Sequence, residues 1–124
     1  MPKRIMVVDD NPAIRRVLKN ILEFNDGWTV CGEAVDGRDA IEKAPQLNPD
    51  LIVLDVSMPV MNGLEAARQI NQLAPETAML MFTMHNSDEL QIAARTAGIR
   101  QVLSKSDAAT DQLMNSLKDV GAES

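Results

Sequence analysis

The chain has 124 residues, which suits one domain with one core, so residues 1–124 are expected to form a single domain. A formal net charge of -6, with two Phe, one Trp and no Tyr, argues against direct nucleic-acid contact, because basic surface and base-stacking rings are scarce. The apolar runs are too short to cross a membrane and the N-terminus lacks the apolar segment of a signal peptide, so we expect a cytoplasmic protein without membrane contact.

Short apolar runs alternate with segments of helical period along the chain. The runs at residues 5–8, 28–31, 51–54, 78–82 and 102–103 predict five strands. These runs are continuous rather than alternating, so both faces of the sheet are covered, which predicts a parallel sheet with right-handed crossovers. Five helices are predicted by apolar residues three or four positions apart, at residues 14–22, 40–44, 64–74, 90–97 and 113–120 (Leu113, Leu117 and Val120).

Helix boundaries are indicated by a few local signals. Asn11, followed by proline, predicts an N-cap, and Gly27 and Gly98 fall where a left-handed residue closes a helix. Pro45 predicts that the second helix stops or kinks near Ala44.

Three residue types occur only once and have plain structural interpretations. Cys31 cannot form an internal disulfide and is predicted to be a buried small apolar residue. Trp28 is placed at the amino end of the second strand, away from the carboxyl edge of the sheet. His85 is interpreted as a loop residue at the start of the fourth helix.

Polar side chains follow four of the predicted strands. They are Asp9 and Asp10 after the first, Asp55 after the third, Thr83 after the fourth and Lys105 after the fifth. The carboxyl ends of parallel strands share one edge, where α/β proteins place their sites. Each of these residues alone is a common residue at the end of a strand, but five of them at one edge indicate a functional site.

The residue types at this edge favour one ion. Clustered carboxylates with neither His nor Cys nearby suit a hard cation, and few protein ligands with open positions suit Mg²⁺ better than Ca²⁺. An aspartate beside Mg²⁺ can act as a nucleophile toward a phosphoryl group, while Lys105 and Thr83 offset the charge on the transferred oxygens.

The stretches "VVDDNP", "LDVSMPVMNGLEA", "FTMH" and "VLSKSD", in this order, resemble the CheY-like receiver domain of two-component response regulators over nearly the whole chain. The resemblance implies a flavodoxin-like (βα)5 three-layer sandwich with strand order 2-1-3-4-5. It also implies a signalling switch rather than an enzyme, which catalyses only its own phosphoryl transfer and slow autodephosphorylation. The phosphoryl donor would be a sensor histidine kinase or a phosphotransfer protein.

The same resemblance implies a role for each residue at the edge. Asp55 is the phosphoacceptor, and Thr83 and Lys105 hold the phosphoryl oxygens. The Mg²⁺ site comprises Asp10 and Asp55 as direct ligands, Asp9 acting through water, and Ser57 through its backbone carbonyl.

Some positions depart from the common receiver pattern. Many receivers have an aromatic residue at the position of Val102 and a smaller residue at the position of Met84. The residue after the lysine is often proline, but here it is Ser106, so a trans Lys105–Ser106 peptide is expected. "TMH" and "LSKSDA" resemble receivers that precede a helix-turn-helix output domain, and the sequence leaves open whether the chain stands alone. We expect phosphorylation to switch the face of the fourth helix and fifth strand, which would control an output partner or strengthen a homodimer.

Two other functions share parts of this pattern. An aspartate-nucleophile phosphatase also places an aspartate after a buried parallel strand, but its second carboxylate would fall at Ser57. A flavin-binding module of similar topology needs a Ser/Thr/Gly-rich loop after the first strand, whereas "DDNPAIRR" would repel a phosphate there.

Overall fold

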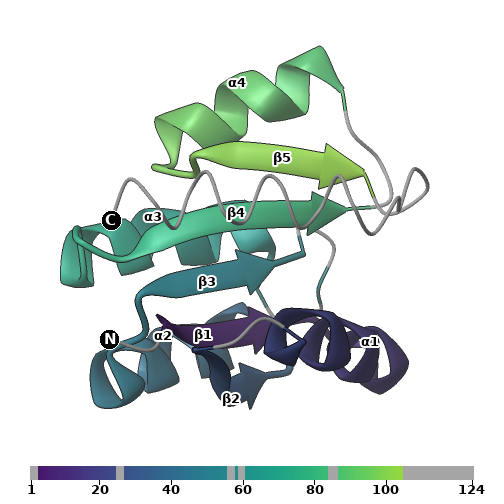
Figure 1. Ribbon diagram of the computed structural model, residues 1–124. Helices are drawn as coiled ribbons and strands as arrows, with labels where there is room; N and C mark the ends of the chain where they lie inside the picture. Colours follow the sequence, from purple (N-terminus) through teal and green to yellow (C-terminus); the bar gives the residue numbers. More distant parts are fainter. Residues whose placement is uncertain (1–2, 25–26, 56–57, 59–60, 84–86, 105–124) are drawn as a thin grey trace.

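A five-stranded parallel sheet forms the centre of the molecule (Figure 1). The computed structural model describes residues 3–24, 27–55, 58, 61–83 and 87–104. The strand order β2-β1-β3-β4-β5 and the parallel pairing are both as predicted. The strands are β1 (Lys3–Val8), β2 (Trp28–Ala34), β3 (Leu51–Leu54), β4 (Ala78–Thr83) and β5 (Gln101–Ser104).

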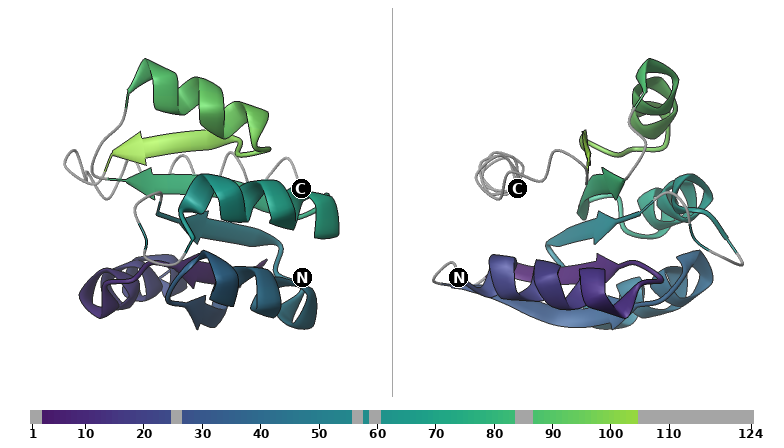
Figure 2. Two further views of the ribbon diagram at one scale, coloured as in Figure 1. Left: turned by 180° about the vertical axis from the view of Figure 1, so that it is seen from behind. Right: turned by 90° about the vertical axis from the view of Figure 1, so that its right-hand side faces the viewer.

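Helices cover both faces of this sheet and complete three layers. Seen from behind in Figure 2, α2 and α3 lie together in front of the strands. The helix predicted at Leu113, Leu117 and Val120 falls outside the described residues. Within the described part, none of the helices is long and apolar enough to cross a membrane. The described helices are α1 (Pro12–Glu23), α2 (Gly37–Leu47), α3 (Gly63–Leu73) and α4 (Asp88–Thr96), and the architecture is the predicted flavodoxin-like fold.

Alternation along the strands divides the core between the two faces. In β1, Met6 and Val8 pack toward α2, α3 and α4, whereas Ile5 and Val7 pack toward α1. All four side chains are fully or almost fully buried, and burial of each contributes about 2 kcal/mol to folding. The fully buried residues of the helices over the first face are mainly alanines, which lets these helices approach the strands closely (Ala40, Ala44, Ala67 and Ala94).

The predicted helix boundary signals have the expected geometry. The Asn11 side chain accepts a hydrogen bond from the Ala13 N–H at 2.9 Å, and the following proline is the first residue of α1. Gly27 and Gly98 have φ values of 85° and 93°, in the left-handed region. Gly98 also donates its N–H to the Arg95 carbonyl at 3.1 Å, which closes the end of α4.

The second helix does not stop near Ala44, so the prediction of its end is wrong. Helix α2 continues through Pro45 to Leu47. Pro45 lacks the N–H that would donate to the carbonyl four residues earlier, but only two helical residues follow it, so the effect of the proline is confined to the last turn. Asn48, at φ 48°, closes this turn by donating its N–H to the Ala44 carbonyl at 2.9 Å.

Cys31 is half-buried rather than buried, which corrects the prediction made from its apolar surroundings. Strand β2 is an edge strand, so it is covered less completely than the central strands. Consecutive residues of β1 pair with Val30 and Gly32, which leaves Cys31 as the extra residue of a β-bulge. Partial burial raises the pKa of the Cys31 thiol, and the nearby Arg4 acts in the opposite direction.

The strand register predicts that tryptophan fluorescence responds little to Mg²⁺. Trp28 pairs with Lys3, at the amino end of both strands, whereas Asp9 follows the carboxyl end of β1. A Mg²⁺ titration followed by intrinsic fluorescence should therefore show only a small change. As a control, Val56→Trp in a Trp28→Phe background places the ring beside Asp55 and should be quenched strongly. Strong quenching of the wild-type protein would contradict the observed register.

Candidate metal and phosphoacceptor site

Backbone pairing continues one residue beyond the strands that carry the acidic residues. The Asp9 N–H donates to the Ala34 carbonyl, and the Asp55 N–H donates to the Val8 carbonyl, each at 3.1 Å. Both aspartates are therefore fixed by the ends of β1 and β3, which are neighbouring strands. This pairing places the two residues at the same edge of the sheet.

The structure brings the three predicted acidic residues together. One carboxylate oxygen from each of Asp9, Asp10 and Asp55 lies within 4.8 Å of the other two. Asp9 and Asp55 are only 2% and 7% exposed, whereas Asp10 is exposed to solvent. A set of hard oxygen donors that is open on one side fits Mg²⁺, which usually keeps water and phosphate oxygens among its ligands.

The turn that carries the acidic pair is held by local hydrogen bonds. The Asn11 N–H donates to Asp9 Oδ1 at 2.9 Å, so the carboxylate of Asp9 is tied to the start of α1. Arg15, one turn further along this helix, donates from Nη1 to the Asp9 carbonyl at 2.6 Å. Arg15 could not be identified from the sequence, because its position within an ordinary amphipathic helix gives no sign of the contact.

Thr83 occupies the predicted place at the same edge. It is the last residue of β4, is 1% exposed, and pairs with Ser104 of β5. Ser57 and Lys105 lie outside the described residues, so their predicted roles stay predictions. The same applies to the predictions for Met84, His85 and the Lys105–Ser106 peptide.

The loop that follows the candidate phosphoacceptor is braced by the start of α2. The Gly37 N–H donates to the Met61 carbonyl at 3.3 Å. A Cβ atom added at Gly37 would lie 2.7 Å from the Met61 carbonyl oxygen and 3.0 Å from Ala66 Cβ. The absence of a side chain at this position therefore permits the close approach of α2 and the loop between β3 and α3.

Gly37→Ala is expected to destabilise the protein by about 2 kcal/mol, because the new methyl group must displace backbone atoms. Urea unfolding measures the change. In the control variant Gly32→Ala, the added Cβ meets only the Leu47 side chain, which can rotate away, so a smaller loss is expected. Equal stability of Gly37→Ala and wild type would show that the close approach is not required.

A flavodoxin-like sheet with an acidic cluster at its carboxyl edge is the arrangement that the resemblance to receiver domains predicts. Residues 5–118 match the response regulator receiver domain family, so the chain belongs to that family. Phosphorylation and Mg²⁺ binding are characteristic of the family, which acts as a switch in two-component signalling. Membership confirms the receiver prediction over the phosphatase and flavin-binding alternatives.

Curated relatives differ in how much of their own length the chain covers. The chain is 35% identical over 105 residues to the chemotaxis protein CheY of Thermotoga maritima, covering 85% of this chain and 87% of CheY. It is 36% identical over 114 residues to the transcriptional regulatory protein YdfI of Bacillus subtilis, covering 92% of this chain and 53% of YdfI. It therefore spans most of CheY but about half of YdfI.

Solved structures show the same fold over nearly the whole chain. The response regulator domain of Thermotoga maritima CheB superposes with a TM-score of 0.92 at 30% identity, covering 98% of each chain. A LuxR-family response regulator from Aurantimonas sp. SI85-9A1 superposes with a TM-score of 0.93 at 31% identity, covering 99% of this chain and 87% of that one.

Proposed function

We propose that Asp55 accepts a phosphoryl group from a phosphohistidine on a sensor histidine kinase or a phosphotransfer protein. The observation that carries this proposal is the convergence of the Asp9, Asp10 and Asp55 carboxylates within 4.8 Å at the carboxyl edge of the sheet. A carboxylate oxygen of Asp55 would attack phosphorus, the P–N bond of the donor would break, and the imidazole would leave with its electron pair. The product is a mixed anhydride on Asp55.

The other residues at the edge would support this transfer. Asp10 and Asp55 would bind Mg²⁺ directly, Asp9 through water, and Ser57 through its backbone carbonyl. Mg²⁺, when bound, offsets negative charge on the phosphoryl oxygens. Thr83 and Lys105 would donate hydrogen bonds to those same oxygens, and the near-complete burial of Thr83 limits the directions in which its hydroxyl can point.

The proposed activity is confined to the chain's own modification. Residues 1–124 would act as one receiver domain in the cytoplasm, which catalyses its own phosphorylation and slow dephosphorylation. Family membership and the chain's coverage of CheY support this proposal. The chain spans only about a quarter of another relative, a protein-glutamate methylesterase of Trichodesmium erythraeum to which it is 46% identical over 84 residues.

Incubation with a small acyl phosphate and Mg²⁺ tests this function. Intact mass should increase by one phosphoryl group, and the increase should disappear when the metal is chelated. The modified protein should return to its original mass without any added phosphatase, because a mixed anhydride hydrolyses unaided. Phosphorylation that is stable to prolonged incubation, or that is unaffected by chelation, would contradict the proposal.

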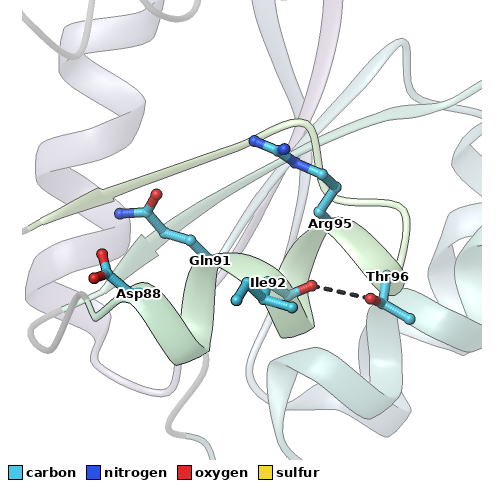
Figure 3. Close-up of a pocket in the computed structure, with 5 residues that line it drawn as sticks. All are labelled: Asp88, Gln91, Ile92, Arg95 and Thr96. Atoms are coloured by element: carbon cyan, nitrogen blue, oxygen red, sulfur yellow. Dashed lines mark hydrogen bonds between the residues drawn. The ribbon is translucent and has the colours of Figure 1, made fainter.

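We further propose that α4 and β5 carry the output face. The exposed side chains of Asp88, Gln91, Ile92 and Arg95 lie along α4, where they line a shallow pocket of about 440 Å³ together with Thr96 (Figure 3). Ile92 is 69% exposed and lies between charged and polar neighbours, so a partner that covered this face would bury it. A contact of this face with an output partner, or with a second copy of the chain, would read the phosphorylation state.

Amide exchange tests this output face. Val102 is half-buried beside the core and has no ring to rotate, so the signal would travel through Thr83 and the loop before α4. A phosphoryl mimic with Mg²⁺ should change protection across residues 83–105 as well as near Asp55. A population shift on the order of 1 to 3 kcal/mol is expected. Changes confined to residues 55–60 would show that the signal leaves elsewhere.

A further inference from the structure

One guanidinium group connects α1 to the end of β1 and to β2. Arg15, on α1, donates from Nη1 to the carbonyl of Asp9 at 2.6 Å and from Nε to Glu33 Oε1 of β2 at 3.0 Å. The Arg15 side chain is only 15% exposed, whereas that of Glu33 is 42% exposed. A planar guanidinium that binds two acceptors at once has a defined orientation, which a single ammonium group does not have.

This contact completes the fixation of Asp9. The backbone N–H of Asp9 donates to the Ala34 carbonyl, its Oδ1 accepts from the Asn11 N–H, and its carbonyl accepts from Arg15. This carbonyl lies between the end of β1 and the start of α1. Arg15 therefore binds the peptide unit that joins Asp9 to Asp10.

We propose that Arg15 is a positioning residue that holds the Asp9–Asp10 turn in its cation-binding geometry, with Glu33 orienting the guanidinium. This inference rests on the proposed Mg²⁺ site. Residues that hydrogen-bond to a metal ligand without contacting the metal typically contribute ten- to a hundredfold to metal affinity. Because Asp9 is already held at its N–H and Oδ1, loss of Arg15 is expected to weaken Mg²⁺ binding by about tenfold, at the lower end of that range.

The charge of Arg15 and its contact with the Asp9 carbonyl predict opposite effects of its removal on Mg²⁺ affinity. Arg15 is a cation near a cation site, so on electrostatic grounds alone its removal should strengthen Mg²⁺ binding. If its main role is to position the turn, its removal should weaken binding although a positive charge has been lost. The direction of the change in affinity therefore separates the two roles.

Calorimetric Mg²⁺ titration of Arg15→Met, Arg15→Lys and Arg16→Met tests the proposal. Arg16 is the adjacent exposed arginine, so Arg16→Met removes the same charge without the Asp9 contact and should bind Mg²⁺ as tightly as wild type or slightly more tightly. Arg15→Met should bind about tenfold more weakly. Arg15→Lys keeps the charge but cannot hold both acceptors in the fixed geometry of a guanidinium, so it should also bind Mg²⁺ more weakly. This variant still tests the proposal if Arg15→Met does not fold.

The outcomes separate this inference from the proposed function. Equal or tighter Mg²⁺ binding by the folded Arg15 variants, with normal binding by wild type, would overturn the positioning role alone. Failure of wild type to bind Mg²⁺ would overturn the proposed site, and the inference with it. At saturating Mg²⁺, phosphorylation of Arg15→Lys by an acyl phosphate should recover most of the wild-type rate, because the defect lies in affinity. A lasting deficit there would contradict the proposal.

Discussion

Asp10→Asn is expected to abolish Mg²⁺ binding and phosphorylation while stabilising the metal-free protein by about 1 kcal/mol. Three carboxylate oxygens lie within 4.8 Å of one another, so the metal-free site contains like charges at close range. Replacing one carboxylate with a neutral amide of the same shape relieves this repulsion and removes a metal ligand. Thermal unfolding in the presence of chelator, together with a Mg²⁺ titration, measures both effects.

Glu42→Gln provides the matched control, because it removes one negative charge from an exposed position on α2. Glu42→Gln should leave Mg²⁺ binding unchanged and should alter stability much less than Asp10→Asn does. Asp10 is exposed, so the stabilisation of Asp10→Asn should shrink as the salt concentration rises. A lower melting temperature for Asp10→Asn than for wild type in chelator would show that the cluster is not strained by charge.

Asp55→Asn is expected to reduce phosphorylation by an acyl phosphate to background, because an amide oxygen is a far weaker nucleophile than a carboxylate. The side chain keeps its shape at a position that is 7% exposed, so the fold should be retained. Intact mass after incubation with acyl phosphate and Mg²⁺ gives the result directly.

Ser57→Ala is the control for this variant, since Ser57 is expected to contribute only its backbone carbonyl. It should be phosphorylated as readily as wild type. If Ser57→Ala lost the modification while Asp55→Asn kept it, the nucleophile would be the hydroxyl and the assignment of Asp55 would be wrong.

The sheet and its acidic edge could be predicted because both depend on local features of the sequence. Continuous apolar runs such as residues 51–54 occur where a strand is buried on both faces, and all four of these residues are buried. The first polar residue after such a run must lie at the carboxyl edge, and this placed Asp9, Asp55 and Thr83 correctly. The strand order came from the family resemblance.

Features that depend on the geometry of particular contacts could not be predicted. The half-burial of Cys31 results from the edge position of β2, which the predicted strand order already implies, and from a bulge against β1, which has no sequence signal of its own. Helix α2 continues two residues past Pro45 before Asn48 closes its last turn, and a proline alone does not fix the residue at which a helix ends. The contact of Arg15 with the Asp9 carbonyl spans six positions and a change from strand to helix, so no periodic pattern indicates it.

Chemical mapping of the phosphorylated residue tests the central claim most directly. Borohydride reduces an acyl phosphate on an aspartate to the corresponding alcohol, which marks the site permanently for peptide mass spectrometry. After phosphorylation in the presence of Mg²⁺ and reduction, the mark should lie on Asp55 and should be absent from protein treated in chelator. A mark on Asp9 or Asp10, or a phosphate that survives reduction on Ser57 or Thr83, would contradict the proposed phosphoacceptor.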